Sequence, residues 1–331
     1  MKQLSLGKIR GLQQLANSDG IFAICAMDHR GSLQKMLNED NPRAVSYKTM
    51  VSYKLDLCRF LAPHCSAVLL DPVYGAAQAI AGGVLPGSTG LLISLESTGY
   101  AGSAEARLTR LLPGWGVEKA KRLGAQAVKL LLYYRPDLRD VASKQLELVK
   151  ALAEDCLRHD IPFLVEPKTY PVGRAEKNPR NFARVKPELV LETARQLSSL
   201  PLDVLKVEFP ADLNYEEDEG RALSLCRQLD EASRVPWVVL SAGVDFELFH
   251  REVKLACQAG ASGFLGGRAL WQEAAGMRSL PQRRDFLRKT VVERLRHLSL
   301  VATTYGVPWF KKLGLSRHEL VTVAENWRQQ Y

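Results

Sequence analysis

Two lysines lie inside strongly apolar segments of the sequence. Lys129 occupies AVKLL and Lys206 occupies VLKVEFP, where most neighbours are valine or leucine. A lysine in such surroundings is either half of a buried ion pair or an amine whose pKa is lowered by burial and by a second nearby ammonium. The second state supplies the neutral nucleophile that imine formation with a ketone requires. Both interpretations stay open from the residues alone.

Carboxylates stand at the ends of three apolar segments, where they could act on these amines. They are Asp28, Glu166 and Glu208, and strand alternation predicts that Lys206 and Glu208 share one face. If the apolar wall raises their pKa values, such groups can move protons during imine formation and carbon–carbon cleavage. The alternative is that each carboxylate is an ion-pair partner. The two roles are compatible when the partner is the reacting amine.

Short apolar runs carry these residues, and amphipathic stretches such as 144–160 and 187–200 separate them. The runs are rich in Val, Leu, Ile and Phe, as expected for strands covered on both faces. Repeated alternation of strand and helix predicts an α/β fold, a (β/α)8 TIM barrel, whose strand ends ring the catalytic mouth. The eight runs are 22–28, 67–72, 91–96, 127–134, 162–167, 204–210, 237–243 and 263–269.

The two ends of the chain lie outside these eight runs. A helix over about residues 5–18 is expected to plug or flank the barrel floor. Residues 285–305 and 316–330 also look helical. We therefore expect one domain over residues 1–331, with the barrel at about 20–300 and a C-terminal helical extension at about 301–331.

The last two runs end in residues suited to an anion. LSAGVD supplies Ser241 and Gly243, and GFLGGRALW supplies Gly267 and Arg268. Barrels commonly bind phosphate at the loops after strands seven and eight, through backbone N–H groups and nearby cations. The alternative is that the glycines only permit tight turns. The location beside Arg268 favours a phosphate site.

The chain has 45 basic and 36 acidic side chains, a formal charge of +9. Long basic runs and interleaved aromatics are missing, so a nucleic-acid partner is not expected. An anionic small molecule or a solvated surface accounts for the excess. Part of the excess positive charge lies in an expected loop, residues 168–187. This loop is either a mobile lid above the mouth or a solvated loop. That segment holds Lys168, Arg174, Lys177, Arg180, Arg184 and Lys186 against one acid, Glu176.

Several classes of protein do not fit the sequence. No apolar stretch approaches the ~18 residues of a spanning helix, and the first residues lack the apolar core of a signal peptide, so no membrane partner is expected. The six cysteines form no C-x-x-C pair and are expected to be buried, reduced thiols, which predicts a cytoplasmic location. Only His29 among the histidines adjoins a strand end, so neither a metal nor another cofactor is expected.

The motifs, taken in order, resemble the class I tagatose 1,6-bisphosphate aldolases. These form a lysine-dependent barrel group that also includes sulfofructose-phosphate aldolases. The similarity covers about residues 15–275 and fades in the C-terminal extension. The motifs that carry it are AMDHRG, LLDPVYG, LESTGY, AVKLLLYY, VEP, VLKVEFP, LSAGV and GGRALW.

The resemblance implies a role for each matching residue. Lys206 would form the imine, Lys129 and Glu166 would be the auxiliary acid/base pair, and Asp28 would be the first-strand carboxylate. The residues that would bind substrate or phosphate are His29, Arg30, Ser241, Gly243, Gly267 and Arg268, with Arg30 contacting a second anion.

Two positions depart from the pattern of the group. His29 stands where a glutamine is common, and Ser97 replaces the lysine of E-K-T-G-Y. The missing lysine removes a positive charge near the mouth and leaves the choice of sugar phosphate open.

The resulting expectation is a lyase that cleaves tagatose 1,6-bisphosphate to dihydroxyacetone phosphate and glyceraldehyde 3-phosphate. Fructose 1,6-bisphosphate stays a candidate, because stereochemistry at C4 leaves no trace in the sequence. The alternatives are a 6-deoxy-6-sulfofructose-1-phosphate aldolase that releases sulfolactaldehyde, a non-catalytic barrel that senses phosphosugars, and, more weakly, a pyridoxal-phosphate enzyme. A homo-oligomer is expected, since apolar patches on barrel helices often support dimers.

Overall fold

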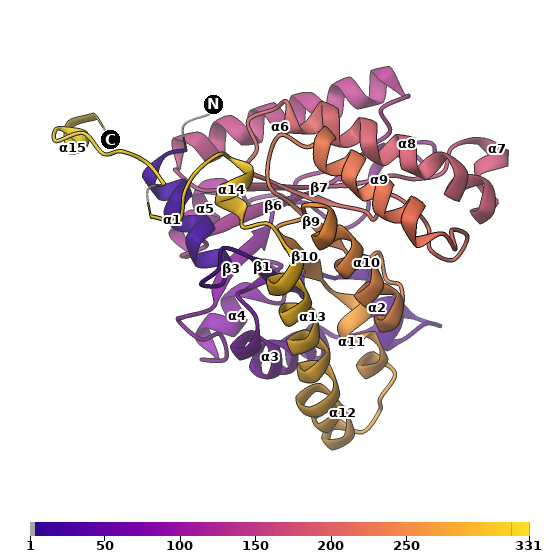
Figure 1. Cartoon of the computed structure of the whole chain (residues 1–331). Coiled ribbons are helices and arrows are strands. Elements are labelled where there is room, and N and C mark those ends of the chain that lie inside the picture. Colours follow the sequence, from indigo (N-terminus) through magenta and orange to yellow (C-terminus); the bar gives the residue numbers. More distant parts are fainter. Residues whose placement is uncertain (1–3, 319, 331) are drawn as a thin grey trace.

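Eight parallel strands close into a barrel in the computed structural model, which describes residues 4–318 and 320–330 (Figure 1). The order around the barrel is β1-β10-β9-β8-β7-β6-β3-β2. Barrel strands that follow one another along the chain are therefore neighbours in space, and every neighbouring pair is parallel. The predicted TIM barrel is confirmed. The strands are β1 Phe22–Ala26, β2 Ala67–Leu70, β3 Gly90–Ser94, β6 Ala127–Tyr133, β7 Phe163–Lys168, β8 Val204–Val207, β9 Trp237–Leu240 and β10 Gly263–Gly266.

Each predicted run contains a strand, but several strands end before the polar residues that closed the run. β1 stops at Ala26, ahead of Asp28, and β8 stops at Val207, ahead of Glu208. These residues follow the ladder, so their backbone is free to turn the side chain toward the mouth or away from it. Long-range contacts decide which of the two occurs.

Helices and short turns surround the barrel and make most of the connections between strands (Figure 1). The exception is the segment between β3 and α5, which carries a small antiparallel hairpin of β4 (Ala101–Ser103) and β5 (Ala106–Leu108). The helices are α2 Gly31–Leu37, α3 Tyr47–Leu61, α4 Ala76–Ala81, α5 Val117–Arg122, α6 Arg139–Arg158, α7 Gly173–Glu176, α8 Pro179–Ser198, α9 Glu219–Ala232, α10 Phe246–Ala259, α11 Arg268–Ala275, α12 Leu280–Phe286 and α13 Val292–Tyr305, with 3-10 turns at Pro42–Ala44 and Ala62–His64 and a π-helical turn at Leu287–Val291.

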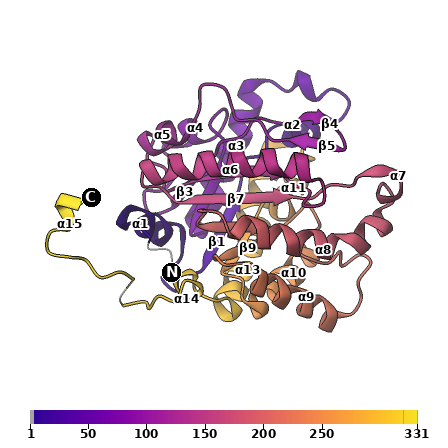
Figure 2. The same cartoon turned by 90° about the horizontal axis from the view of Figure 1, so that it is seen from above.

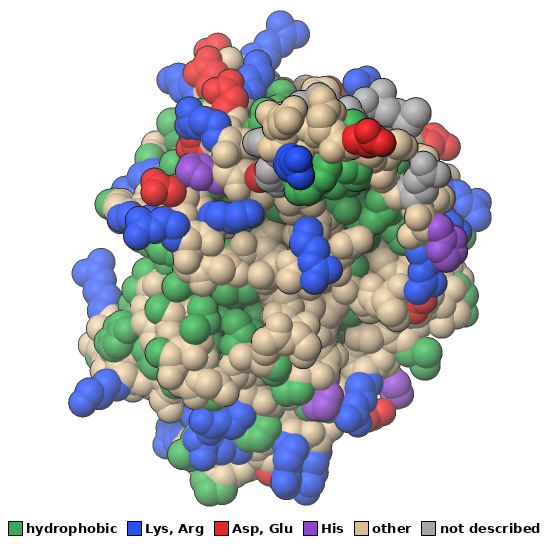
Figure 3. Space-filling view, turned by 90° about the vertical axis from the view of Figure 1, so that its left-hand side faces the viewer, with side chains coloured by type: hydrophobic (Ala, Val, Ile, Leu, Met, Phe, Trp, Pro, Cys, Tyr) green, Lys and Arg blue, Asp and Glu red, His purple; other side chains and the backbone are tan. Residues whose placement is uncertain are grey.

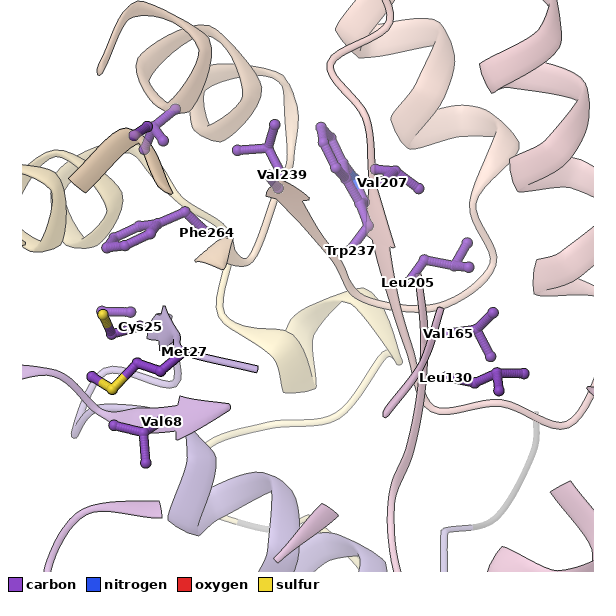
Figure 4. Close-up of a cluster of buried hydrophobic side chains, with 14 of the residues drawn as sticks. Cys25, Met27, Val68, Leu130, Val165, Leu205, Val207, Trp237, Val239 and Phe264 are labelled. Carbon is purple, nitrogen blue, oxygen red and sulfur yellow. The ribbon is translucent and has the colours of Figure 1, made fainter. Parts of the chain in front are cut away.

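Alternation along each strand sorts the core into two layers. One set of side chains packs between the strands and the surrounding helices, and Figure 4 shows ten labelled members, including Val165, Leu205 and Val239. The alternate set, which includes Leu164 and Val204, forms a second cluster within the barrel. Residues two positions further along the same strands therefore share the inward face and lie nearer the mouth.

Two helices close the lower end of the barrel. α1 (Leu6–Leu15) and α14 (Trp309–Lys312) pack apolar side chains onto the inner cluster, at the end opposite α7 (Figure 2). The contact is close: a Cβ on Gly11 would lie 2.5 Å from the carbonyl oxygen of Gln126, so only glycine fits there. The expected N-terminal helix is confirmed at the floor, although it is shorter than residues 5–18.

Residues 168–187 are not the loop that was expected. Lys168 belongs to β7, α7 follows, and α8 begins at Pro179 because the Asn178 side chain accepts the N–H groups of the first helical turn. Three of the six basic residues therefore stand on α8. Whether this segment closes over the mouth stays a prediction.

The expected helix over residues 316–330 is wrong for most of its length. Among its described residues only α15 (Trp327–Gln330) is helical. Leu320 and Val321 still pack against the inner cluster, and beyond them the chain runs away from the body of the protein (Figures 1 and 2). Val321–Thr322–Val323 is β-branched, and Val323 is exposed, so no buried apolar stripe stabilises a helix. Glu319, in the same stretch, lies outside the described residues.

Charged side chains on one face of the protein are dispersed, and most of the cysteines are buried. On the side of the molecule where both termini lie, Lys and Arg side chains are scattered rather than gathered in one track (Figure 3). All six cysteines are free, five of them buried. Within the described ranges no helix is both long enough and apolar enough to span a membrane.

Candidate active site

Lys129 lies at the centre of a buried charge cluster at the mouth. Its Nζ is 2.8 Å from Asp28 Oδ2, 2.8 Å from Glu96 Oε1 and 3.0 Å from Glu166 Oε2. The carboxylates come from β7 and from the residues that follow β1 and β3, and they converge because the carboxyl ends of parallel strands meet at one rim. Lys129 is 2% exposed, so the cluster is shielded from water.

Lys206 joins the same cluster through Glu166. Its Nζ is 2.8 Å from Glu166 Oε1, so the two oxygens of Glu166 each bind a different lysine. The register between β7 and β8 pairs Val165 with Leu205, which sets Glu166 and Lys206 side by side on the inward face. The ion-pair interpretation therefore describes the resting site, and the sequence-predicted residues Lys129, Lys206, Glu166 and Asp28 are brought together.

The pKa shifts in this cluster run opposite to the sequence expectation. Burial alone would lower the pKa of Lys129, but Asp28, Glu166 and Glu96 outweigh it and hold that pKa well above its usual value. Burial would raise the pKa of Asp28 and of Glu166, yet attraction to Lys129 and Lys206 keeps both below their usual range. Lys129 is therefore an ammonium and both carboxylates are ionised at neutral pH. Of the two interpretations left open by the sequence, the neutral amine is wrong for Lys129, because opposite charges at contact distance overcome desolvation.

Glu96 is a site residue that sequence reasoning did not assign. Besides contacting Lys129, its Oε2 accepts the N–H of Leu131 at 3.0 Å, and its backbone carbonyl accepts Arg30 Nη2 at 2.5 Å. Glu96 thus connects Lys129 to Arg30, the residue expected to contact a second anion. Its position at the end of the apolar run 91–96, within LESTGY, was the available signal.

His29 faces the cavity next to the ring of Trp271, with ring centroids 5.2 Å apart and edge to face. Burial lowers the pKa of His29 to about 3 against the opposing effect of Asp28, and the positive charges of Arg268, Lys206 and Lys54 act in the same direction as burial. The imidazole is therefore neutral at physiological pH. Its Nδ1 is buried and has no hydrogen-bond partner among the described residues. That nitrogen can therefore accept a hydrogen bond from a ligand or donate one to it, depending on the tautomer.

The residues predicted to form an anion cradle lie together between the ends of β9 and β10. The Gly267 N–H donates to Ser241 Oγ at 3.4 Å, and Arg268 Nη2 donates to the Ala242 carbonyl at 3.2 Å. Gly243 has φ +87°, and a Cβ there would lie 2.8 Å from Arg268 Cζ, so glycine makes room for the guanidinium. Arg268 Nε is buried without a partner in the described structure, which leaves a donor available to an anion.

The charge cluster, Arg30 and His29 line one cavity of about 270 Å³ at the carboxyl ends of the strands, together with Ser241, Gly267 and Arg268. Gly243, which was also predicted to bind phosphate, is not part of that lining. Lys168, Ser97 and Tyr133 complete its wall. Glu208 is not part of the lining: its carboxylate accepts both the N–H and the hydroxyl of Thr169 at 2.7 Å. The expectation that Glu208 accompanies Lys206 at the mouth is wrong, since β8 ends before Glu208.

The described residues include no group of three His, Cys, Asp or Glu side chains arranged to hold a metal ion. The three carboxylates of the cluster converge on the Lys129 ammonium instead. What the arrangement offers chemically is a pair of lysines, bases ionised at neutral pH, and cations at the rim.

Comparison with known proteins agrees with this geometry. The chain is 34% identical to tagatose 1,6-diphosphate aldolase 1 of Enterococcus faecalis over 286 residues, covering 82% of this chain and 86% of the relative. It is 33% identical to the tagatose 1,6-diphosphate aldolase of Staphylococcus haemolyticus over 328 residues, covering 92% and 98%. A solved fructose-bisphosphate aldolase from Plasmodium falciparum has the same fold, with a TM-score of 0.70, 16% identity and coverage of 92% and 98%.

The family model that matches describes a DeoC/LacD family aldolase and spans residues 22–273, from the first residue of β1 into α11. That match contains every residue of the charge cluster and of the anion cradle. The chain therefore belongs to the DeoC/LacD family of aldolases and is a lyase.

Proposed function

We propose that this chain is a class I aldolase that cleaves a ketose 1,6-bisphosphate through an imine on Lys206. The observation that carries the proposal is the sharing of Glu166 by two buried lysines, at 2.8 and 3.0 Å. One lysine is fixed as an ammonium by three carboxylates, whereas the other has Glu166 as its one acidic partner among the described residues. Lys206 is thus the amine that can be released for attack.

Imine formation begins with transfer of a proton from Lys206 to Glu166. The Lys206 nitrogen then attacks the C2 carbonyl of the ketose, giving a carbinolamine, and loss of water gives the protonated imine. Lys129 stays charged throughout, so it holds Glu166 in place and stabilises negative charge that develops at the substrate oxygen.

Cleavage uses the protonated imine as the electron acceptor. A carboxylate takes the proton of the C4 hydroxyl, the C3–C4 bond breaks, and its electron pair enters the imine to give an enamine. Asp28 and Glu166 are the candidate bases, because both are ionised and line the cavity. Glyceraldehyde 3-phosphate leaves, C3 is protonated, and hydrolysis of the imine releases dihydroxyacetone phosphate and free Lys206.

Cations in the cavity wall suit two anionic groups. Arg268 with the turns at Ser241–Gly243 and Gly267 would hold one phosphate, and Arg30 would contact the other. Tagatose 1,6-bisphosphate is the preferred substrate, because both sequence relatives are named for it and the chain covers most of their length. Fructose 1,6-bisphosphate differs only at C4 and is the second member of the substrate panel.

One feature favours a second substrate. Ser97 lines the cavity where the family commonly has a lysine, and its hydroxyl donates to the Leu111 carbonyl at 2.9 Å. The site therefore offers less positive charge there, which suits a singly charged sulfonate better than a doubly charged phosphate. 6-Deoxy-6-sulfofructose 1-phosphate, cleaved to dihydroxyacetone phosphate and sulfolactaldehyde, is the alternative substrate.

Borohydride trapping tests the mechanism. Reduction in the presence of dihydroxyacetone phosphate should add the reduced ligand at Lys206, as located by peptide mass spectrometry, and Lys206→Met should abolish the adduct. Lys168→Met is the matched control, since Lys168 also lines the cavity and its variant should keep the adduct. Absence of an adduct at Lys206, or loss of activity with EDTA, overturns the proposal.

Cleavage rates on tagatose, fructose and sulfofructose phosphates then identify the substrate. Ligand binding without turnover of any of them would point to a phosphosugar-sensing barrel, and a visible absorbance band would point to pyridoxal phosphate. We also propose that the protein is cytoplasmic, has a single domain and forms a homo-oligomer. Light scattering of the purified chain measures its molar mass in solution and so tests the oligomeric state.

A further inference from the structure

The end of β1, just before Asp28, is held by side chains rather than by the barrel ladder alone. The Ala26 carbonyl accepts Trp271 Nε1 at 3.1 Å, and the Met27 carbonyl accepts Lys54 Nζ at 2.6 Å. The Met27 N–H still donates to the Leu69 carbonyl at 2.8 Å. Two consecutive carbonyls therefore leave the strand pattern and are fixed by donors from α11 and α3.

Lys54 is itself locked in place. It is 1% exposed on α3 and forms a buried ion pair with Asp71, which is fully buried after β2. Asp71 Oδ1 in turn accepts the N–H groups of Val73 and Tyr74 at 2.9 and 2.8 Å, so the carboxylate is fixed by the turn before α4. Asp71 lies in the apolar run 67–72, and it does not line the cavity.

These contacts make Lys54 a rigid connection between the end of β1 and the turn after β2. The carbonyl it binds belongs to the residue that precedes Asp28, and Asp28 must lie 2.8 Å from Lys129 to complete the charge cluster. A shift of about 1 Å in a positioning contact is enough to reduce turnover a hundredfold. A group that fixes this peptide therefore controls the geometry of the reacting groups without touching the substrate.

We propose that Lys54 is a positioning residue that aims Asp28 at Lys129 and His29 into the cavity, with Asp71 as its anchor. The proposal rests on the proposed aldolase function, since it assigns these two cavity residues to that site. It gives a role in positioning to a buried lysine that takes part in none of the chemical steps.

The chain contains a matched control for this idea at the opposite end of the barrel. Lys8 Nζ is 2.7 Å from Asp203 Oδ2, both side chains are buried, and the same carboxylate oxygen accepts the Phe163 N–H at 2.8 Å. The pair thus shares three features with Lys54 and Asp71. In each, a lysine on a helix pairs with an aspartate next to a strand, and that aspartate also accepts a backbone N–H. It joins α1 to the floor, whereas the residues of the cavity lie at the mouth.

The experiment compares two double variants, Lys54→Met/Asp71→Asn and Lys8→Met/Asp203→Asn. Each removes both charges and keeps an oxygen for the backbone N–H, so neither leaves an unpaired buried ion. Thermal melts establish that both variants fold. The kinetic readouts are kcat, KM and the rate of borohydride capture, and hydrogen exchange of residues 24–30 reports the order of the end of β1.

We expect Lys54→Met/Asp71→Asn to lower kcat and the capture rate at least tenfold, to change KM less than threefold, and to speed exchange over residues 24–30. Lys8→Met/Asp203→Asn should leave kcat within twofold and exchange there unchanged. Equal kinetic effects of the two variants, or unaltered exchange in the first, overturn the positioning role. If the wild-type chain cleaves none of the ketose phosphates, the proposed function fails, whereas the exchange comparison still decides whether Lys54 fixes the end of β1.

Discussion

Replacing Lys129 with methionine tests whether one ammonium holds the active-site cluster together. The substitution keeps most of the side-chain volume and removes contacts of 2.8, 2.8 and 3.0 Å to Asp28, Glu96 and Glu166. Removing one partner of a buried ion pair costs about 3–5 kcal/mol, because the remaining charge is left unpaired away from water. We expect the free energy of unfolding of Lys129→Met at pH 8 to fall by an amount in that range.

The dependence of this loss on pH follows from the pKa of Asp28. In the wild type, burial would raise that pKa, but attraction to Lys129 and Lys206 keeps it below its usual range. A carboxyl of this kind stabilises the fold above its unfolded pKa of about 4, and the stability is lost only as pH falls through the folded pKa. Its contribution is therefore constant between pH 5 and 8.

The variant should behave differently over the same range. Without Lys129, burial raises the carboxylate pKa, so the folded state takes up protons before the unfolded state does. Stability of the variant then increases as pH falls from 8 toward 5, and the gap from the wild type narrows.

Urea unfolding followed by tryptophan fluorescence at pH 5.5 and pH 8 measures both effects. Lys177→Met is the control, since the Lys177 side chain is 67% exposed and lies 3.8 Å from Glu105, so its loss should be barely measurable. A loss below about 1 kcal/mol at pH 8, well short of the cost of a broken buried pair, refutes the reasoning. So does a loss that is equal at the two pH values.

Four further outcomes follow from the site and the core. Glu166→Gln should lower kcat by about 10²–10⁴-fold, the usual contribution of acid–base catalysis, and should slow borohydride capture; an unchanged kcat excludes its proton-transfer role. Arg268→Met should raise KM far more than it lowers kcat in steady-state assays, because it removes an anion contact, and the opposite split contradicts that assignment. His29→Gln should leave the shape of the kcat/KM profile unchanged between pH 5 and 8, because the His29 pKa is lowered to about 3 by burial; loss of an acid limb near pH 6 would show that His29 titrates there. Glu252→Gln should raise the melting temperature at pH 8 and change it little at pH 5, because burial in α10 raises the pKa of Glu252 to about 8. The wild type loses stability as pH rises toward that value, whereas the glutamine stays neutral; equal melting temperatures of variant and wild type at pH 8 contradict this.

The eight strands could be predicted because each is a local pattern. A short run of Val, Leu, Ile and Phe between amphipathic stretches is typical of a strand covered on both faces, whatever lies elsewhere in the chain. The C-terminal segment shows the limit of local patterns. Residues 316–330 look helical by composition, but helix formation needs a packed face, and the chain extends away from the barrel beyond Val321.

The sequence by itself determined which residues within the strands face the inside of the barrel. Lys129, Glu166 and Lys206 share strand parity with the inner apolar cluster, and parity is fixed by the two-residue period of a strand. The tertiary structure alone decided how those residues pair and which of them are charged. Asp28 and Lys129 are 101 positions apart, and Lys54 reaches Met27 across 27 positions. The distances between such groups depend on barrel closure, and the balance between burial and opposite charge, which sets each protonation state, depends on those distances.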